Sequence, residues 1–205
     1  MPPLEYLSLL LGASFASGLN LYASVATLGL LDRFGVIHLP ASLGILSHPL
    51  VLGVAITLYV LEFFADKIPY LDNVWDAIHT FIRPAAAALL AYGLMSPVAP
   101  EWRIVAALCA GGVALISHGT KATARLAVNA SPEPFSNSLL SLAEDGIAIT
   151  LVWMATKHPI LTTMIATLLL AFSFYLLWKF FRLVRRAIRW IFGKKPSITT
   201  PPLPA

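Results

Sequence analysis

Charged side chains gather in two blocks of this 205-residue sequence, and their spacing suits ion or proton binding. In the first block, Glu62 and Asp66 are four residues apart, so they lie on one face of a helix. An ionisable group inside a bilayer costs roughly 2.5–3.5 kcal/mol on insertion scales, and it usually faces the bundle interior or a water-filled cavity. We therefore interpret Glu62 and Asp66 as candidates for binding a cation or a proton. For Asp66 and the adjacent Lys67, a position at the membrane interface is the alternative.

A short amphipathic helix is expected after Pro69, over residues 71–83, because apolar residues recur there with a helical period. Its polar stripe consists of Asp72, Asp76, His79 and Arg83. The stripe either meets water at the membrane surface or lines a polar cavity in the bundle. Asp76 and His79 could form a pair that titrates near neutral pH. We expect no metal site, because the other histidines are scattered along the chain.

The second block, residues 117–146, is rich in cations and amides. Its candidate binding or coupling residues are His118, Lys121, Arg125, Asn129, Glu133, Asn137, Glu144 and Asp145. The first four recur every three to four residues, so a helix carries them on one face, and Pro132 and Pro134 end that helix. Paired with the acids of the first block, these cations could be tolerated in a membrane. They could equally hold an anionic substrate.

The composition is that of a membrane protein. Hydrophobic residues make up 58% of the chain and charged residues only 12%, and no charge occurs in residues 6–31 or 160–178. A helix of roughly 20 residues crosses a bilayer. We predict an all-α, polytopic membrane helix bundle of about six spans, in a single domain over residues 1–178. The predicted spans are 7–31, 50–65, 84–95, 104–117, 139–155 and 160–178.

The first predicted span contains a possible helix break at Gly18 and Asn20. An unwound turn there would expose backbone groups to a cavity, as interrupted helices do in transporters. Small residues at these positions equally suit close packing between helices.

The distribution of Lys and Arg predicts the orientation. With six spans and both termini in the cytoplasm, eleven of these cations lie inside and three outside, which agrees with the positive-inside rule. Residues 179–195 form a basic amphipathic helix on the cytoplasmic side. Its candidate contacts to anionic phospholipid are Arg182, Arg185, Arg186 and Arg189, which otherwise serve as ordinary anchors. Residues 196–205 are Pro-rich, and we predict that they are disordered.

An internal repeat is suggested by GVAITL at residues 53–58 and GIAITL at residues 146–151. If it is real, the chain divides into halves at residues 4–97 and 102–178. With three spans in each half, the halves would be inverted relative to each other, which is a common transporter plan.

Two long polar stretches carry a resemblance to a known family. EFFADKIPYLDNVWDAIHTFIRP and HGTKATARLAVNASPEPFSNSLLSLAED closely resemble the bacterial integral-membrane family catalogued as domain of unknown function 4126. The resemblance implies a multi-pass inner-membrane protein and supplies no activity. A weaker likeness is to cation-proton exchangers with a Glu-x-Gly-Asp-Lys motif. Here Glu62 lies four residues before Asp66 instead of three, and Ala65 replaces the glycine.

Three functions remain open at this point. The first is a transporter or exchanger of a small ion or solute, with or without coupling to protons, and the others are a lipid-binding protein and a structural membrane protein. An enzyme is not expected, because no Ser-His-Asp arrangement, metal pair or phosphate loop is recognisable. We also expect no cofactor and no nucleic-acid partner. A homo-oligomer is possible.

Overall fold

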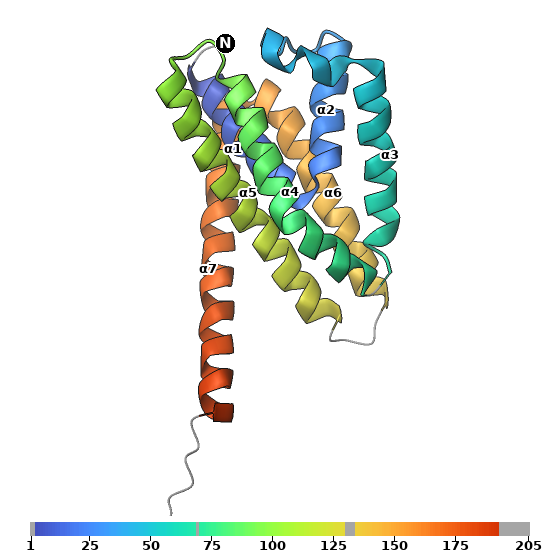
Figure 1. Cartoon of the computed structure of the whole chain (residues 1–205), viewed down its shortest axis with the longest axis vertical. Helices are drawn as coiled ribbons and strands as arrows, with labels where there is room; N and C mark the ends of the chain where they lie inside the picture. Colours follow the sequence, from blue (N-terminus) through green and yellow to red (C-terminus); the bar gives the residue numbers. More distant parts are fainter. Residues whose placement is uncertain (1–2, 69, 130–133, 193–205) are drawn as a thin grey trace, which may run out of the picture.

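The computed structural model describes residues 3–68, 70–129 and 134–192, and these residues are helical apart from short connections. In chain order the elements are α1 (Pro3–Leu19), α2 (Leu21–Arg33), the 3₁₀ helix η1 (Ala41–Ser47), α3 (Pro49–Ala65), α4 (Leu71–Leu94), α5 (Pro100–Asn129), α6 (Pro134–Lys157) and α7 (Pro159–Phe192). No strand occurs in the described ranges. The all-α prediction is therefore confirmed (Figure 1).

Helices α4, α5, α6 and α7 are long and apolar enough to cross a membrane. A fifth crossing is possible if η1 and α3, which meet at an angle of 63°, together form one bent span. The chain thus has the helices of a multi-pass membrane protein. The predicted count of six spans is not confirmed.

In place of the first predicted span, α1 and α2 form a helical hairpin. Helix α1 enters the bundle from one end, and α2 returns toward the same end (Figure 1). Accordingly Leu9, near the start of α1, and Leu28, near the end of α2, belong to one hydrophobic cluster. With 17 and 13 residues, neither helix has the roughly 20 residues that a crossing needs. The prediction of a single span over residues 7–31 is wrong, because the chain reverses at Asn20.

A helix does begin at Leu71, as predicted, but the predicted end at Arg83 is wrong, because α4 continues without a break through Pro84. A proline in a transmembrane helix is tolerated where neighbouring helices compensate for the lost hydrogen bond. Helix α4 packs along α5, which likewise runs unbroken from the apolar segment into the second polar block. The polar residues therefore form the inward faces of long helices.

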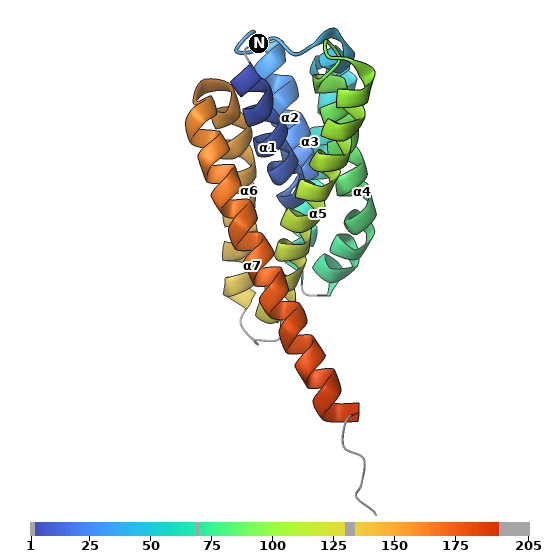
Figure 2. The same cartoon turned by 90° about the vertical axis from the view of Figure 1, so that its left-hand side faces the viewer.

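Helix α7 is 34 residues long, which corresponds to about 51 Å at 1.5 Å per residue. Its last turns extend beyond the other helices (Figure 2). The basic segment predicted as a separate surface helix from residue 179 is a continuation of α7 as far as Phe192. The predicted disordered tail, residues 196–205, lies outside the described residues.

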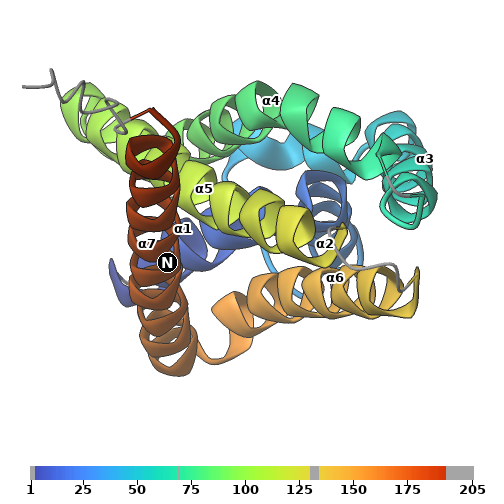
Figure 3. The same ribbon diagram turned by 90° about the horizontal axis from the view of Figure 1, so that it is seen from below.

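The hairpin lies at the centre of the bundle. Helix α1 contacts α4, α5, α6 and α7, and the view along the bundle shows it enclosed by them (Figure 3). Its small residues allow this close packing, since Ala16, Ser17 and Ser8 are completely buried. The start of α1 and the end of α7 lie at opposite ends of the bundle (Figure 2). The structure therefore does not support the prediction that both termini face the same side.

The predicted internal repeat is not confirmed. Helices α3 and α6, which carry the two similar hexapeptides, run in opposite directions, as an inverted repeat requires (Figure 1). However, the first half begins with the α1–α2 hairpin, whereas the second half begins with the single 30-residue helix α5.

Candidate functional site

Nine charged side chains meet inside the bundle, and we refer to them as the charge cluster. They are Glu62, Asp66, Asp72, Asp76, Arg83, Lys121, Arg125, Glu144 and Asp145. They come from α3 and the residue after it, α4, α5 and α6, and each is at most 5% exposed. Both polar blocks of the sequence thus turn toward one interior region.

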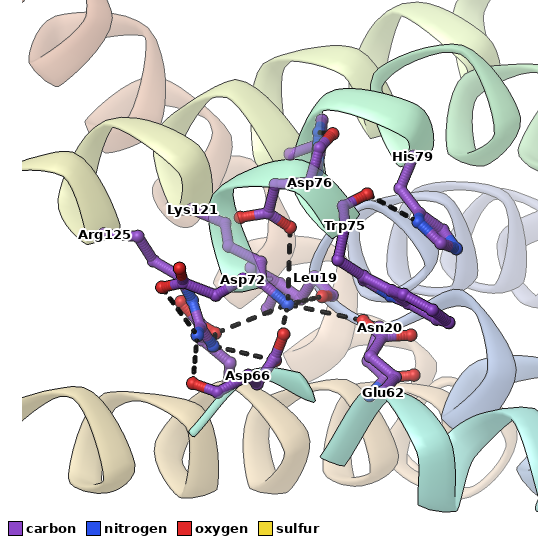
Figure 4. Close-up of polar contacts among 12 residues, drawn as sticks. Leu19, Asn20, Glu62, Asp66, Asp72, Trp75, Asp76, His79, Lys121 and Arg125 are labelled. Atoms are coloured by element: carbon purple, nitrogen blue, oxygen red, sulfur yellow. Dashed lines mark hydrogen bonds and ion pairs between the residues drawn. The ribbon is translucent and has the colours of Figure 1, made fainter. Parts of the chain in front are cut away.

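Lys121 lies at the centre of the charge cluster. Its Nζ is 3.0 Å from Asp66 Oδ2 and 3.4 Å from Glu62 Oε1. Glu144 Oε2 follows at 3.6 Å and Asp76 Oδ1 at 4.0 Å. Figure 4 shows this ammonium at the meeting point of lines from α3, α4 and the end of α1. One ammonium group therefore lies within 4.0 Å of four carboxylates.

Arg125 joins the end of α3 to α6. Its Nη2 donates to Asp66 Oδ2 at 2.8 Å and to Glu144 Oε2 at 2.6 Å, while Nη1 donates to the backbone carbonyl of Asp66 at 2.8 Å. Asp72 Oδ2 lies 3.8 Å from Nη1. A guanidinium has several donors in a fixed plane, so it can hold several acceptors at once.

Arg83 pairs with Glu62 and lies 3.6 Å from Asp76 Oδ1. Its Nη1 also donates to His118 Nδ1 at 2.7 Å. Because a guanidinium only donates, His118 Nδ1 must accept, and the ring is neutral with its proton on Nε2. That Nε2 lies 3.0 Å from the backbone carbonyl of Asp76. His118 therefore supports the arginine and is not a charged member of the cluster.

The reversal between α1 and α2 is part of the same site. At the end of α1, the carbonyls of Gly18 and Leu19 accept hydrogen bonds from Arg83 and Lys121, at 3.0 and 3.1 Å. At the start of α2, Asn20 accepts from the backbone N–H of Ala23 at 2.9 Å. Cations thus face the negative end of α1, as the helix dipole favours.

Gly18 allows α1 to approach α5 closely. A Cβ at this position would lie 2.7 Å from Ser117 Cβ and would overlap the carbonyl of Ala114. Ser117 in turn donates to the carbonyl of Phe15 at 2.8 Å. The sequence left two interpretations of this region open. Gly18 allows close helix packing, whereas the helix breaks at Asn20.

Amide side chains close the cluster at the end where α4 begins. Asn129 donates to Asp72 Oδ2 at 2.8 Å, and Asn137 donates to the carbonyl of Asp66 at 2.9 Å. The other oxygen of Asp72 accepts from the backbone N–H of Asn73 at 2.6 Å. Asp72 is therefore well satisfied by neutral donors.

The remaining predicted site residues lie outside the charge cluster. His79 makes hydrogen bonds with Tyr22 at 3.0 Å and with the carbonyl of Trp75 at 2.7 Å, not with Asp76. Lys67 is half-buried, and its Nζ donates to the carbonyl of Phe63. Burial lowers the pKa of this ammonium, while the nearby carboxylates oppose that shift. Glu133 lies outside the described residues.

Four arginines of α7 are exposed and lie far along the helix from the cluster. They are Arg182, Arg185, Arg186 and Arg189. Arg182 and Arg186 line a groove of about 620 Å³ between α5 and α7, together with Lys179. A second groove of about 440 Å³ between α2, α3 and α4 is mainly apolar and reaches Tyr22.

Sequence reasoning missed the partners that are not charged side chains. The carbonyls of Gly18 and Leu19 carry no sequence signal, because every residue has such a group. Tyr22 follows directly after the break and contacts His79, but an aromatic residue in an apolar segment is unremarkable in sequence. Only the break itself, at Asn20, could have directed attention to these groups.

The charge cluster contains six carboxylates but only three cations. Several buried carboxylate oxygens also lack a hydrogen-bond partner: both of Asp76, Oε2 of Glu62, Oδ1 of Asp66 and Oδ2 of Asp145. Buried charges without partners are strongly unfavourable. The excess carboxylates must therefore carry protons or be accompanied by further cations. Among the described residues, no group of three or more His, Cys, Asp or Glu side chains is arranged to hold a metal ion.

Comparison with known proteins gives one match. A family model described as a domain of unknown function (DUF4126) matches residues 7–179. No curated protein and no solved structure matches the chain.

Proposed function

Because the chain belongs to the DUF4126 family, whose description assigns no activity, we propose a function from its geometry: a transporter of a small ion or solute, coupled to protons through the charge cluster. The family membership confirms the resemblance found in the sequence. The four described helices that are long and apolar enough to cross a membrane support a multi-pass membrane protein, and we propose the bacterial inner membrane as its location.

The excess of carboxylates over cations carries this proposal. A cluster that served only to hold helices together would be most stable with matched charges, because each uncompensated buried charge is costly. Six acids facing three cations instead create sites that gain and lose protons or ions. Ionisable residues inside a membrane bundle commonly mark ion pathways and proton relays.

The hairpin supports the same function. Discontinuous helices that end near the middle of a membrane protein commonly form transporter binding sites, since their free backbone groups can bind ions. Here α1 ends and α2 begins beside Arg83, Lys121 and Asp145.

Proteoliposomes test the proposal. We expect the purified protein to couple an imposed pH gradient to the flux of an ion or solute, followed with a pH-sensitive dye inside the vesicles. Glu62→Gln, which removes a completely buried carboxylate, should reduce this coupled flux at least tenfold. Glu101→Gln, at an exposed acid on α5, is the matched control and should transport like the parent. If Glu62→Gln transported as well as the parent, the Glu62 carboxylate would have no role in coupling transport to protons.

Lipid binding is the second candidate function, and the groove between α5 and α7 favours it. Lys179, Arg182 and Arg186 line this groove next to aromatic residues, and Arg can bind a phosphate group through two hydrogen bonds. Native mass spectrometry with anionic phospholipid provides the test. Lys179→Ala/Arg186→Ala should lose bound lipid, whereas Arg185→Ala/Arg189→Ala, with the same change in charge outside this groove, should retain it.

The orientation also follows from the cations, under the proposed location. Among the described residues, Lys67 follows α3 at the end of the bundle toward which α7 carries its basic residues. Arg33, Arg103 and Lys157 stand at the end of α2, near the start of α5 and at the end of α6, which all lie at the other end (Figure 1). The positive-inside rule places the end of α7 in the cytoplasm. The start of α1 then faces the opposite side.

A further inference from the structure

The surroundings of the Lys121 ammonium resemble the coordination shell of an ion more than a salt bridge. Five oxygens lie between 3.0 and 4.0 Å from Nζ: four carboxylate oxygens and the backbone carbonyl of Leu19. We call this group the oxygen cage; its members are Leu19, Glu62, Asp66, Asp76 and Glu144. An ammonium has only three hydrogens to donate, so two of the five oxygens receive no hydrogen bond from it.

The hydrogen bonds of Nζ go to Leu19, Glu62 and Asp66. Glu144 and Asp76 are nearby but accept none from it. A spherical cation has no such limit, and carboxylate and carbonyl oxygens are the ligands that hard cations prefer. The oxygen cage therefore offers more oxygens than Lys121 can bind. With the ammonium among them, the described carboxylates are not arranged to hold a metal ion, so a cation enters as the ammonium leaves and the carboxylates close around it.

We propose that the transported substrate is a monovalent cation, which binds in the oxygen cage in exchange for the proton of Lys121. This inference rests on the proposed function, whose substrate it names. A single charge is indicated because the group now in the cage carries one positive charge, at the negative end of α1.

Lysine is the only cation of the charge cluster that can give up its proton. The guanidinium groups of Arg83 and Arg125 stay charged in proteins, whereas buried lysine amines can become neutral. The two arginines also bind backbone carbonyls, at Gly18 and Asp66, and so hold the helices in place. The arginines form the permanent frame, and Lys121 is the exchangeable centre.

The exchange step balances in charge and atoms. An N–H bond of Lys121 breaks and an O–H bond forms on Asp66, whose Oδ2 accepts a hydrogen bond from the ammonium at 3.0 Å. Lys121 becomes a neutral amine that leaves the centre of the oxygen cage, and the entering cation takes over the positive charge there. When Asp66 later releases its proton to water, one cation has been exchanged for one proton.

Replacing the ammonium from solution tests the oxygen cage directly. Lys121→Ala removes the resident charge and leaves the five oxygens, so we expect a lower melting temperature in detergent. Ammonium or methylammonium chloride should then raise the melting temperature by roughly 5 °C, as a ligand that binds only the folded state does. Tetramethylammonium chloride at the same ionic strength is too large and should not. Lys157→Ala, which removes an exposed lysine at the end of α6, should show no difference between these salts. Equal effects of all salts on Lys121→Ala would overturn the proposal.

A second measurement applies even if Lys121→Ala does not fold. Sodium or potassium chloride is added to the weakly buffered, detergent-solubilised parent, and the release of protons is followed with a pH dye. We expect about one proton per bound cation in the parent and none in Lys121→Arg, because a guanidinium retains its proton. Proton release that is the same in both proteins, or absent in both, would refute the exchange at Lys121.

The experiments distinguish a failure of the transport proposal from a failure of the proposed cation site in the oxygen cage. Coupled transport of an uncharged solute or an anion, without any effect of cations on melting or proton release, would overturn the cation cage and leave a transporter. Cation rescue of Lys121→Ala, together with no flux in proteoliposomes under any gradient, would support the oxygen cage and overturn transport.

Discussion

The side-chain amide of Asn20 donates a 2.8 Å hydrogen bond to Oδ1 of Asp145 and so joins the reversal between α1 and α2 to α6. The carbonyl oxygen of the same side chain caps α2 by accepting from Ala23. Asn20 has an extended backbone, with φ −147° and ψ 105°, and is completely buried. One residue therefore ends a helix, starts the next and provides the hydrogen bond to a buried carboxylate.

Asn20→Ala should destabilise the protein by about 2 kcal/mol or more. Loss of a helix cap costs about 0.5–2 kcal/mol, and a buried acceptor left unsatisfied costs about 1–3 kcal/mol. Thermal unfolding in detergent measures the change. Thr167→Ala, which removes an exposed hydroxyl bonded within α7, is the control and should change the melting temperature little. Equal stability of the two variants would mean that Asn20 does not hold the reversal.

Gly18→Ala should also destabilise the protein, by about 1–3 kcal/mol, because the added methyl group would overlap Ser117 and force α1 away from α5. Gly112→Ala is the matched control on α5, since a Cβ there meets nothing within 4 Å. Alanine has the higher helix propensity, so Gly112→Ala should be neutral or slightly stabilising. Parallel melting curves of the two variants check the difference. A Gly18→Ala protein as stable as Gly112→Ala would contradict the close packing.

The grouping of the charges of α4 on one helix face could be predicted from the sequence, whereas their inward position was one of two alternatives. Asp72, Asp76 and Arg83 recur with a helical period, so one stripe was evident without a structure. The helix boundaries were harder. Pro84 reads as a break in sequence, but packing against α5 carries α4 past it.

The reversal at Asn20 could not be predicted, for a physical reason. Hydropathy is the same whether an apolar segment crosses a membrane or turns back within it. What stabilises the turn is a set of cations from distant positions, Arg83 and Lys121, which bind the free carbonyls of α1. The span count and the orientation both depended on this one turn.

Arg125 should be far more sensitive to substitution than its partner Glu144. Arg125→Gln leaves the carboxylates of Asp66 and Glu144 without a guanidinium, and breaking a buried ion pair from one side costs about 3–5 kcal/mol. We expect little folded protein by size-exclusion chromatography. The double variant Arg125→Gln/Glu144→Gln removes one carboxylate together with the cation, so part of the folded fraction should return.

The same double variant separates a transporter from a purely structural protein. If the charge cluster only fixes the helices, the double variant should behave like the parent in every assay once it folds. If the cluster couples transport, the refolded double variant should have lost coupled flux in proteoliposomes. Normal flux in a stable double variant would therefore count against the proposed function.

Cysteine labelling should place the start of α1 and the end of α7 on opposite sides of the membrane. In a Cys109→Ser background, Leu4→Cys and Glu101→Cys should react with an impermeant maleimide in intact spheroplasts. These positions lie at the starts of α1 and α5, which both begin at the outer end of the bundle in the proposed orientation. Arg189→Cys should react only after permeabilisation. Six crossings would instead place Leu4 in the cytoplasm and leave Glu101 outside. Labelling of Leu4→Cys only after permeabilisation, with Glu101→Cys labelled before it, would therefore contradict the hairpin, since an additional crossing would have to lie between α1 and α3.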